Sequence, residues 1–592
     1  MRLNESVTMT TRTMHAGGEW LTTDVAANDV FAPERLSDEH RLIQQTAQEF
    51  VAKEVLPALG ELEQKNWTLA RALIRRAGDL GLLGTDVPEA FGGVALDKVA
   101  SIVVAEAIGA SASFSTTFGA QTGLSIIPIL CFGTDAQQRA YLPRILSGEL
   151  IGAYCLSESA SGSDALGARA RATRQPDGSW RLNGEKLWIT NGGFADVFIV
   201  FAKVDGEQFS AFIVERGFKG VASGKEEHKM GLHGSSTTPL LLADAELPAE
   251  NLLGEVGRGH KIAFNVLNYG RLKLAAMCSG GAKAVIAEAV AYAIARRQFG
   301  QPIAAFGAIR HKLAEMALRT YAIESALYRT AGLIDGATGT SSHSAAALEE
   351  FAVEASALKV AATEMLDYLV DQNVQIHGGN GFVADYPAER RFRDARVNRI
   401  FEGTNEINRL LVPSRLIKRA LKGGPPIIAA AKRLQDELLS PEPAGAESDD
   451  LLGNARRTVG ALKKTALMAI GLALERYGEA IHSEQEVLML LADLVIDVFI
   501  AESAVLRAEQ AAASRLTAAP LHATAAAVYA HDAGLRADAA ARTLFESIAS
   551  GDALRTALAA LHRFLKIAPL DTIAGRRRLA EAAIARRVYL FG

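Results

Sequence analysis

The sequence is poor in cysteine and in net charge, and both shortages exclude classes of protein. Its 592 residues include three cysteines, Cys131, Cys155 and Cys278, which lie too far apart for a zinc-binding spacing or a disulfide framework. The formal net charge of -4 provides no basic surface for nucleic acid. No Gly-x-Gly-x-x-Gly segment follows a predicted strand, which counts against a Rossmann nucleotide domain.

Targeting and membrane signals are also missing from the pattern. The first thirty residues have neither the basic start and apolar run of a secretory signal nor the arginine content of a transit peptide. No uninterrupted apolar run reaches the roughly 18 residues that cross a bilayer. With 49% hydrophobic and 22% charged residues, the composition is that of a soluble globular protein. We therefore expect a cytoplasmic protein with a reducing environment.

The hydrophobic pattern instead indicates several domains of α+β class. Helical spacing dominates the N-terminal and the later parts of the chain, whereas short β-branched and aromatic runs between them predict an antiparallel barrel or sandwich. The segments that this pattern predicts are an N-terminal arm (1–35), a helical domain (36–150) that Ser37 can cap, a β domain (151–260), a helical bundle (261–422), a proline-rich linker with one short amphipathic piece (423–450) and an additional Ala- and Leu-rich helical domain (451–592).

Five polar motifs follow one another along these segments. They are YCLSESASGSD from Tyr154, LWITNGG from Leu187, ARRQFG from Ala295, QIHGGNGF from Gln375 and RIFEGTNEINRL from Arg399. In this order they resemble the acyl-CoA dehydrogenase flavoproteins, over about residues 36 to 422. The resemblance implies the fold of that family, with an N-terminal helical domain, a middle antiparallel β-barrel domain and a C-terminal four-helix bundle. The additional helical domain resembles that of the very-long-chain branch.

Glu402, in the last motif, is the candidate catalytic base. Desaturating a thioester removes an α-proton and a β-hydride, and because no amino acid accepts hydride, a flavin in a non-Rossmann fold is the simplest acceptor. The resemblance implies FAD as the cofactor and Glu402 as the α-proton acceptor. Some family members carry the base immediately before the residue that is Arg271 here, but that position is Gly270. Taken alone, a glutamate in a polar turn is usually a solvated surface residue.

The resemblance also assigns binding residues, although each motif alone has a simpler structural interpretation as a core strand, a flexible turn or a buried ion pair. The residues implied for FAD are Tyr154, Leu156, Ser157, Gly162, Ser163, Trp188, Ile189, Thr190, Arg296, Gln298, Phe299, Gln375, Gly378, Gly379, Thr404, Asn405 and Glu406. The residues implied for the substrate are Ser163, Asn268, Arg271 and Gly403.

Three of these residues imply an oligomer, because Arg296, Gln298 and Phe299 match residues that reach the FAD of a neighbouring subunit. We therefore expect at least a homodimer. The sequence departs from the family at Ser159 and Ala160, where relatives usually have proline, which predicts a less rigid loop. Glu406 also stands where many relatives have Gln or Asp. We predict no metal site, since His377 has no second histidine at ligand spacing and is interpreted as packing.

The substrate and partners follow from the same resemblance. Gly119, Ala120 and Gly123 match the lining of the distal acyl pocket, where small side chains leave room for a long chain. The prediction is oxidation of medium-to-very-long-chain saturated acyl-CoA to trans-2-enoyl-CoA in fatty-acid β-oxidation, with an electron-transfer flavoprotein as electron acceptor. Residues 427–439 and the basic tail either contact a membrane peripherally or pack on their own domain. An acyl-CoA oxidase and a non-catalytic scaffold protein with the same fold are the alternatives.

Overall fold

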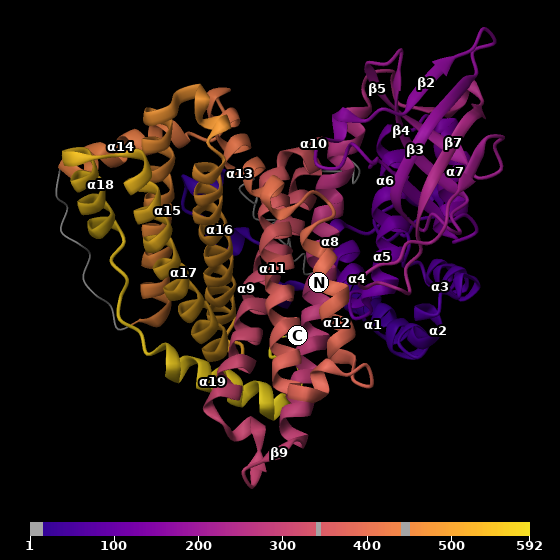
Figure 1. Ribbon diagram of the computed structural model, residues 1–592. Helices are drawn as coiled ribbons and strands as arrows, with labels where there is room; N and C mark the ends of the chain where they lie inside the picture. The colour runs from indigo at the N-terminus through magenta and orange to yellow at the C-terminus, as the bar shows by residue number, and fades with distance from the viewer. Residues whose placement is uncertain (1–15, 339–344, 440–449, 592) are drawn as a thin grey trace, which may run out of the picture.

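The computed structural model describes residues 16–338, 345–439 and 450–591, which form three groups of helices, one eight-stranded sheet and one two-stranded hairpin (Figure 1). In the first helical group, Ser37 accepts a hydrogen bond from the backbone N–H of His40 and so caps α1, as the sequence predicts. The helices of this group are α1 (Asp38–Phe50), α2 (Leu59–Glu63), α3 (Trp67–Asp79), α4 (Lys98–Ile108), α5 (Ala112–Gly119), a π-helical segment (Ala120–Ser125), α6 (Ile126–Phe132) and α7 (Asp135–Leu146).

The predicted strands form one eight-stranded sheet in the order β6-β7-β3-β2-β4-β5-β8, with β1 paired to β4. Most pairings are antiparallel, but β1 and β2 both pair parallel with β4. The sheet lies at the upper right of Figure 1, above α4 and α5, and its pairing of β3 with β7 is interrupted by a bulge between Lys186 and Ile189. The strands are β1 (Gly152–Cys155), β2 (Arg171–Arg174), β3 (Trp180–Thr190), β4 (Val197–Val204), β5 (Gln208–Glu215), β6 (Val221–Ser223), β7 (Thr237–Leu247) and β8 (Leu252–Leu253).

The central bundle is built on α8, a long apolar helix whose sequence charged residues interrupt. This 37-residue helix has a window of mean hydropathy 1.4 and is long and apolar enough, by length and composition, to cross a membrane. Of that window, 67% is buried inside the protein, as in a core helix of a bundle. The bundle consists of α8 (Gly259–Ala295), α9 (Gly307–Thr338), α10 (Ala345–Glu350), α11 (Ala352–His377), α12 (Pro387–Ala395) and α13 (Asn405–Leu421), with a small hairpin of β9 (Arg297–Gln298) and β10 (Gln301–Pro302).

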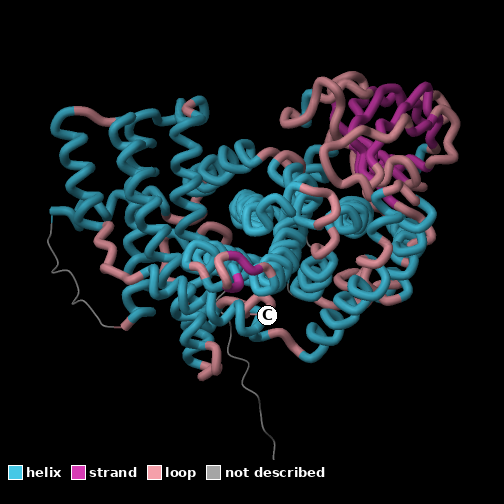
Figure 2. Tube along the Cα trace, turned by 60° about the horizontal axis from the view of Figure 1, so that its bottom comes forward, coloured by secondary structure: helices cyan, strands magenta, loops and turns pink. Residues whose placement is uncertain are grey.

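The additional C-terminal segment is helical and packs beside α9 and α13 (Figures 1 and 2). The short amphipathic piece expected in the linker is α14, whose Ile427 and Leu434 are buried, and the apolar residues Leu590 and Phe591 of the tail are buried too. These four side chains thus pack on the protein itself, whereas Val588 of the tail is 50% exposed, and peripheral membrane contact remains a prediction. The helices are α14 (Ile427–Leu439), α15 (Leu451–Tyr477), α16 (Gln485–Ala513), α17 (Ala519–Ile548), α18 (Gly551–Phe564) and α19 (Thr572–Arg586).

The N-terminal arm joins this segment to the bundle. The Trp20 ring stands 4.8 Å from that of Phe499 on α16, and its indole N–H donates to the Glu354 carboxylate on α11 over 2.8 Å. Further along the arm, Glu34 forms an ion pair with the buried Arg507 of α16. Residues 16–35 of the arm are therefore part of this interface.

Candidate active site

The turn that precedes α13 carries Glu402 in an unusual backbone conformation. Glu402 and Gly403 have φ values of 57° and 81°, which is the left-handed region that side chains other than glycine avoid. Side chains from outside hold this turn, because Arg271 Nε donates to the Glu402 carbonyl over 3.1 Å. Asn408 Nδ2 donates to the next two carbonyls over 2.8 and 3.0 Å. Thr404 then caps α13 by accepting from the Ile407 N–H.

The Glu402 carboxyl group lies against α8 without a hydrogen-bond partner for one oxygen. Its Oε2 atom is buried and unpaired, and it lies 2.8 Å from the place where a Cβ atom on Gly270 would stand. A larger residue at Gly270 would therefore displace the carboxylate. Burial raises the pKa of Glu402 to about 7, and the charges of Arg271 and Lys359 oppose part of that rise. The group is poised to take up a proton near neutral pH.

Two buried cations flank this carboxylate, and the sequence reasoning found only one of them. Arg271 donates through NH1 to Asn268 Oδ1 over 3.1 Å, so the two predicted substrate residues are joined, and burial lowers the pKa of Arg271 to about 10. Lys359 on α11 is fully buried, and burial lowers its pKa to about 8 against the opposing charge of Glu402. The sequence did carry one signal for Lys359, because it is a lone lysine within the apolar run ASALKVAA.

The two predicted flavin-lining segments of the β domain lie side by side. The Leu187 N–H donates to the Ser157 carbonyl over 2.9 Å, and Lys186 Nζ donates to the Leu156 carbonyl over 3.2 Å. Ile189 is buried and Thr190 half-buried. The bulge in β3 puts Trp188 at φ 58°, and this side chain is 59% exposed.

Tyr154, which precedes these segments, connects the β domain to the catalytic turn. Its hydroxyl is buried and unpaired, and burial, followed by the Glu402 charge, holds the Tyr154 pKa well above its usual range. The structure therefore brings Tyr154 close to Glu402, although 247 positions of the sequence separate them. The loop after this segment, where Ser159 and Ala160 replace the usual proline, is fixed at its base by the buried ion pair between Glu158 and Lys186.

A second group of predicted cofactor residues lies at the other end of α8. The exposed residues of this group are Arg296, Gln298, Phe299, Gln375, Gly378 and Gly379. The β9 hairpin that carries part of the group projects at the bottom of Figure 1, and His377 stacks on Tyr292 of α8 with ring centroids 3.9 Å apart. Gly270 is the twelfth residue of α8 and Arg296 follows its end, so roughly 40 Å of helix separates them at 1.5 Å per residue. One chain does not bring the two groups together.

The surfaces of both groups fit a flavin dinucleotide. Phe299 and Trp188 leave large rings 93% and 59% exposed, as partners for a planar aromatic group. A Cβ placed on Gly162, Gly378 or Gly379 would meet nothing within 4 Å, so these backbones are open to an anion such as pyrophosphate. Ser163 and Glu406 are exposed as well. The Asn405 amide, in contrast, is buried and committed to α11, which leaves only its backbone for a cofactor.

The glycines predicted to widen the acyl pocket face long side chains of α8. A Cβ on Gly119 would stand 3.0 Å from Met277 Cε, and one on Gly123 would stand 3.5 Å from Lys273 Cδ. Ala120 is buried beside them. Met277 and Lys273 therefore lie against these small residues in this structure, and the room for a long acyl chain remains a prediction.

A carboxylate with a raised pKa, next to surfaces that suit a flavin, is the arrangement of a flavin-dependent dehydrogenase, and comparison with known proteins gives the family. Residues 37–149, 153–245 and 257–417 match the models of the acyl-CoA dehydrogenase N-terminal, middle and C-terminal domains, and residues 461–563 match another acyl-CoA dehydrogenase C-terminal domain model. A probable acyl-CoA dehydrogenase of Bacillus subtilis (strain 168) is 45% identical over 97% of this chain and 98% of its own.

Two further similarities are informative. The mitochondrial very long-chain specific acyl-CoA dehydrogenase of Rattus norvegicus is 42% identical over 56% of this chain and 51% of its own. The crystal structure of an acyl-CoA dehydrogenase complexed with FAD from Bacillus anthracis superposes with a TM-score of 0.96 at 45% identity, covering 97% of this chain and 100% of that one. The chain belongs to the acyl-CoA dehydrogenase family and is an FAD-dependent oxidoreductase. The predicted family, fold class and cofactor are confirmed.

Proposed function

We propose that this enzyme oxidises medium-to-very-long-chain saturated acyl-CoA to trans-2-enoyl-CoA in fatty-acid β-oxidation, with Glu402 as the α-proton acceptor. The observation that carries the proposal is the buried, unpaired Oε2 of Glu402, whose pKa lies at about 7. An unpaired carboxylate oxygen is free to bond to a proton, and a pKa near the working pH suits a group that takes it in one step. Bound FAD supplies the acceptor for the β-hydride.

The chain's own residues orient the reacting groups. Within the described residues, the backbone N–H of Glu402 donates to no acceptor, so it is available to polarise the thioester carbonyl oxygen. Arg271 is bonded to Asn268 and donates to the Glu402 carbonyl, so these two residues hold the turn behind the carboxylate. The Glu402 side chain is left facing α8. Entry of the acyl chain completes the exclusion of water from Oε2, which keeps the carboxylate basic.

We also propose that the working unit is a homodimer. Support comes from the separation of the predicted FAD residues into two groups that α8 holds far apart. A second copy of the chain can bring its Arg296, Gln298 and Phe299 to the flavin surface that Tyr154 and Trp188 form. A guanidinium suits pyrophosphate in charge and fork geometry.

The substrate range and the electron acceptor are proposed on the family resemblance. The additional helical segment favours long acyl chains, and an electron-transfer flavoprotein is the proposed acceptor of the electrons. Cytoplasmic location remains a prediction from the sequence.

An anaerobic titration of the FAD-loaded protein with palmitoyl-CoA tests the proposal. We expect bleaching of the visible flavin absorbance by the wild type, and slow recovery when air is admitted. Rapid recovery in air would instead indicate an oxidase, and no bleaching with C8 to C20 acyl-CoA would indicate a scaffold. Glu402→Gln should retain FAD and bind palmitoyl-CoA but bleach at least about 1,000-fold more slowly, because no base is left at the α-carbon. Normal bleaching by that variant would remove Glu402 from the mechanism.

A further inference from the structure

Asn405, the first residue of α13, directly follows the catalytic turn and is held by α11 through every polar atom of its side chain. Lys359 Nζ donates to Asn405 Oδ1 over 2.6 Å. Asn405 Nδ2 donates to Thr363 Oγ1 over 3.1 Å and to Glu364 Oε1 over 3.0 Å. Asn405 is 2% exposed, so no water replaces these partners. The start of α13 is therefore fixed by the position of Glu364.

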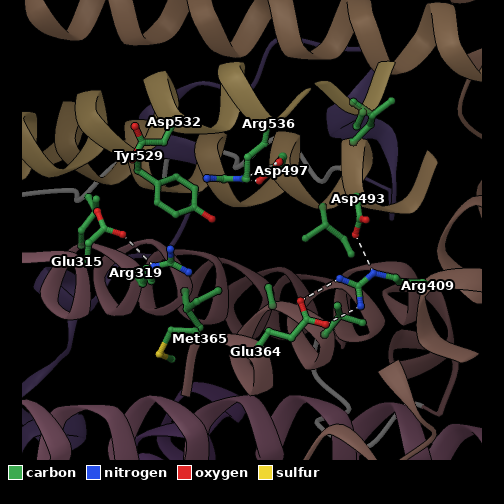
Figure 3. A pocket seen from close by; sticks show the side chains of 17 residues that line it. Glu315, Arg319, Glu364, Met365, Arg409, Asp493, Asp497, Tyr529, Asp532 and Arg536 are labelled. Carbon is green, nitrogen blue, oxygen red and sulfur yellow. Dashed lines mark hydrogen bonds and ion pairs between the residues drawn. The ribbon is translucent and has the colours of Figure 1, made fainter. Parts of the chain in front are cut away.

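Glu364 is itself held by Arg409 of α13, which in turn is bonded to the additional C-terminal segment. Arg409 on α13 grips the Glu364 carboxylate with both terminal nitrogens, over 2.6 and 2.9 Å. The remaining Nε of Arg409 donates to Asp493 Oδ1 on α16 over 2.7 Å, as Figure 3 shows. The Arg409 side chain is 15% exposed, and its fork geometry holds both carboxylates in one plane. Polar contacts thus run without a gap from α16 to the catalytic turn.

The catalytic turn needs such support because its backbone is strained. Glu402 has a left-handed conformation that the local sequence does not favour, since only Gly403 is a glycine. Strained residues keep their conformation when neighbouring contacts over-determine it, and a misplacement of the base by about 1 Å is enough to slow catalysis severely. Arg271 and Asn408 fix the turn from one side, and Asn405 fixes it from the other.

We propose that Asp493 of the additional segment is a positioning residue for the catalytic turn, acting through Arg409, Glu364 and Asn405. This gives the additional segment a part in catalysis although it lines no part of the candidate active site described above. The proposal rests on the proposed role of Glu402 as the base. Loss of a contact in this chain should therefore impair catalysis, whereas loss of another ion pair at the same interface should not.

The same interface contains a matched control. Asp497 lies one turn further along α16, lines the same cavity of about 370 Å³, and pairs with Arg536 of α17 over 2.6 Å (Figure 3). This second ion pair joins two helices of the additional segment, α16 and α17. Removal of Asp497 therefore removes one interface carboxylate but no hydrogen bond of the chain that leads to Asn405.

The test compares Asp493→Ala, Asp497→Ala and Asp493→Glu in the full-length, FAD-loaded protein. For Asp493→Ala we expect kcat with palmitoyl-CoA to fall about tenfold while KM changes less than about twofold, because the base and not the binding surface is misplaced. Asp493→Glu should recover most of the loss, and Asp497→Ala should behave as the wild type. Arg409→Lys keeps the charge but loses the fork, and should match Asp493→Ala.

Hydrogen exchange of the amides in residues 402–410 gives a readout that does not depend on activity. We expect exchange about tenfold faster in Asp493→Ala and unchanged in Asp497→Ala, because only the former loosens the turn. Equal effects of the two alanine variants on kcat, or unchanged exchange in Asp493→Ala, would overturn the proposal. Faster exchange combined with an active Glu402→Gln variant would instead retain the contact chain and refute the proposed role of Glu402.

Discussion

The Glu402 carboxylate lies in the space that a side chain on Gly270 would occupy, with Oε2 only 2.8 Å from the missing Cβ. We expect Gly270→Ala to push the carboxylate away and to lower kcat by about 10- to 100-fold, while FAD content stays normal. Gly460→Ala is the control, since that helical glycine has open space beside it and alanine there should raise stability by up to about 1 kcal/mol. Full activity of Gly270→Ala would show that the carboxylate works from another position.

The raised pKa of Glu402 predicts the pH dependence of the reaction. A base acts only when it is ionised, so kcat/KM should fall as the pH drops through about 7 and level off above it. The dependence of kcat/KM reports the free enzyme, in which the pKa has this value. A profile that stays flat down to pH 5 would contradict the burial of this carboxyl group.

The same pKa has a consequence for stability, and its sign is unusual for a carboxyl group. Because the folded-state pKa exceeds the ordinary value of 4.5, the folded protein binds more protons than the unfolded chain between about pH 5 and 7, and stability falls as the pH rises through this window. Glu402→Gln should therefore be more stable than the wild type by about 1 to 3 kcal/mol at pH 8 and equally stable at pH 4. Thermal unfolding at both pH values measures this difference.

Glu364 provides the opposite sign for comparison. Burial works against its ionisation, but hydrogen bonds and charge from Arg409 prevail and lower its pKa below 4.5. The ionised Glu364 carboxylate therefore stabilises the folded protein above the unfolded-state pKa, and this stabilisation is lost as the pH falls through the folded-state pKa. Glu364→Gln should thus lower stability at pH 8, whereas Glu402→Gln raises it.

Lys359 should set the value of the Glu402 pKa. Its charge is one of the two that lower that pKa, so Lys359→Met should move the midpoint of the kcat/KM profile upward by about one pH unit. The variant also removes the shorter of the two hydrogen bonds to Asn405 Oδ1, so a loss of about 1 to 3 kcal/mol in stability is expected. Lys359→Arg keeps the charge and should keep the midpoint. A midpoint that does not move in Lys359→Met would show that the charge of Lys359 does not affect the pKa of Glu402.

The sequence predicts elements that depend on local pattern and misses relations that depend on packing. Ser37 as a cap and the strand patterns of the β domain are local signals, and the structure confirms them. The role of Lys359 was not predicted because its partners, Asn405 and Glu402, lie more than forty residues away in sequence. The filling of the space beside Gly119 by Met277 could not be predicted either, since it depends on how α8 crosses α5. Motif resemblance supplied the remaining site residues, which no pattern of spacing would have found.

Met277 should control the acyl-chain range. Truncation by Met277→Ala opens the space beside Gly119, so the ratio of kcat/KM for C18 over C8 acyl-CoA should rise by about threefold or more. Met316→Ala on α9 is the control, because Met316 is also buried and its truncation should cost about 2 to 5 kcal/mol without changing that ratio. If both variants leave the ratio unchanged, the acyl chain does not pass between α5 and α8.

The two groups of cofactor residues that α8 holds far apart allow a complementation test of the homodimer. Arg296 is exposed at the far end of the helix from Gly270 and Glu402, so we expect each active site to take Glu402 from one copy and Arg296 from the other. Glu402→Gln and Arg296→Ala should each be inactive alone. After unfolding and refolding together with FAD, half of the dimers should be mixed, and each mixed dimer should contain one site with both wild-type residues. The mixture should therefore recover about one quarter of wild-type activity. If both residues serve the site of their own chain, a mixed dimer has no intact site, and the activity stays at the level of the separate variants.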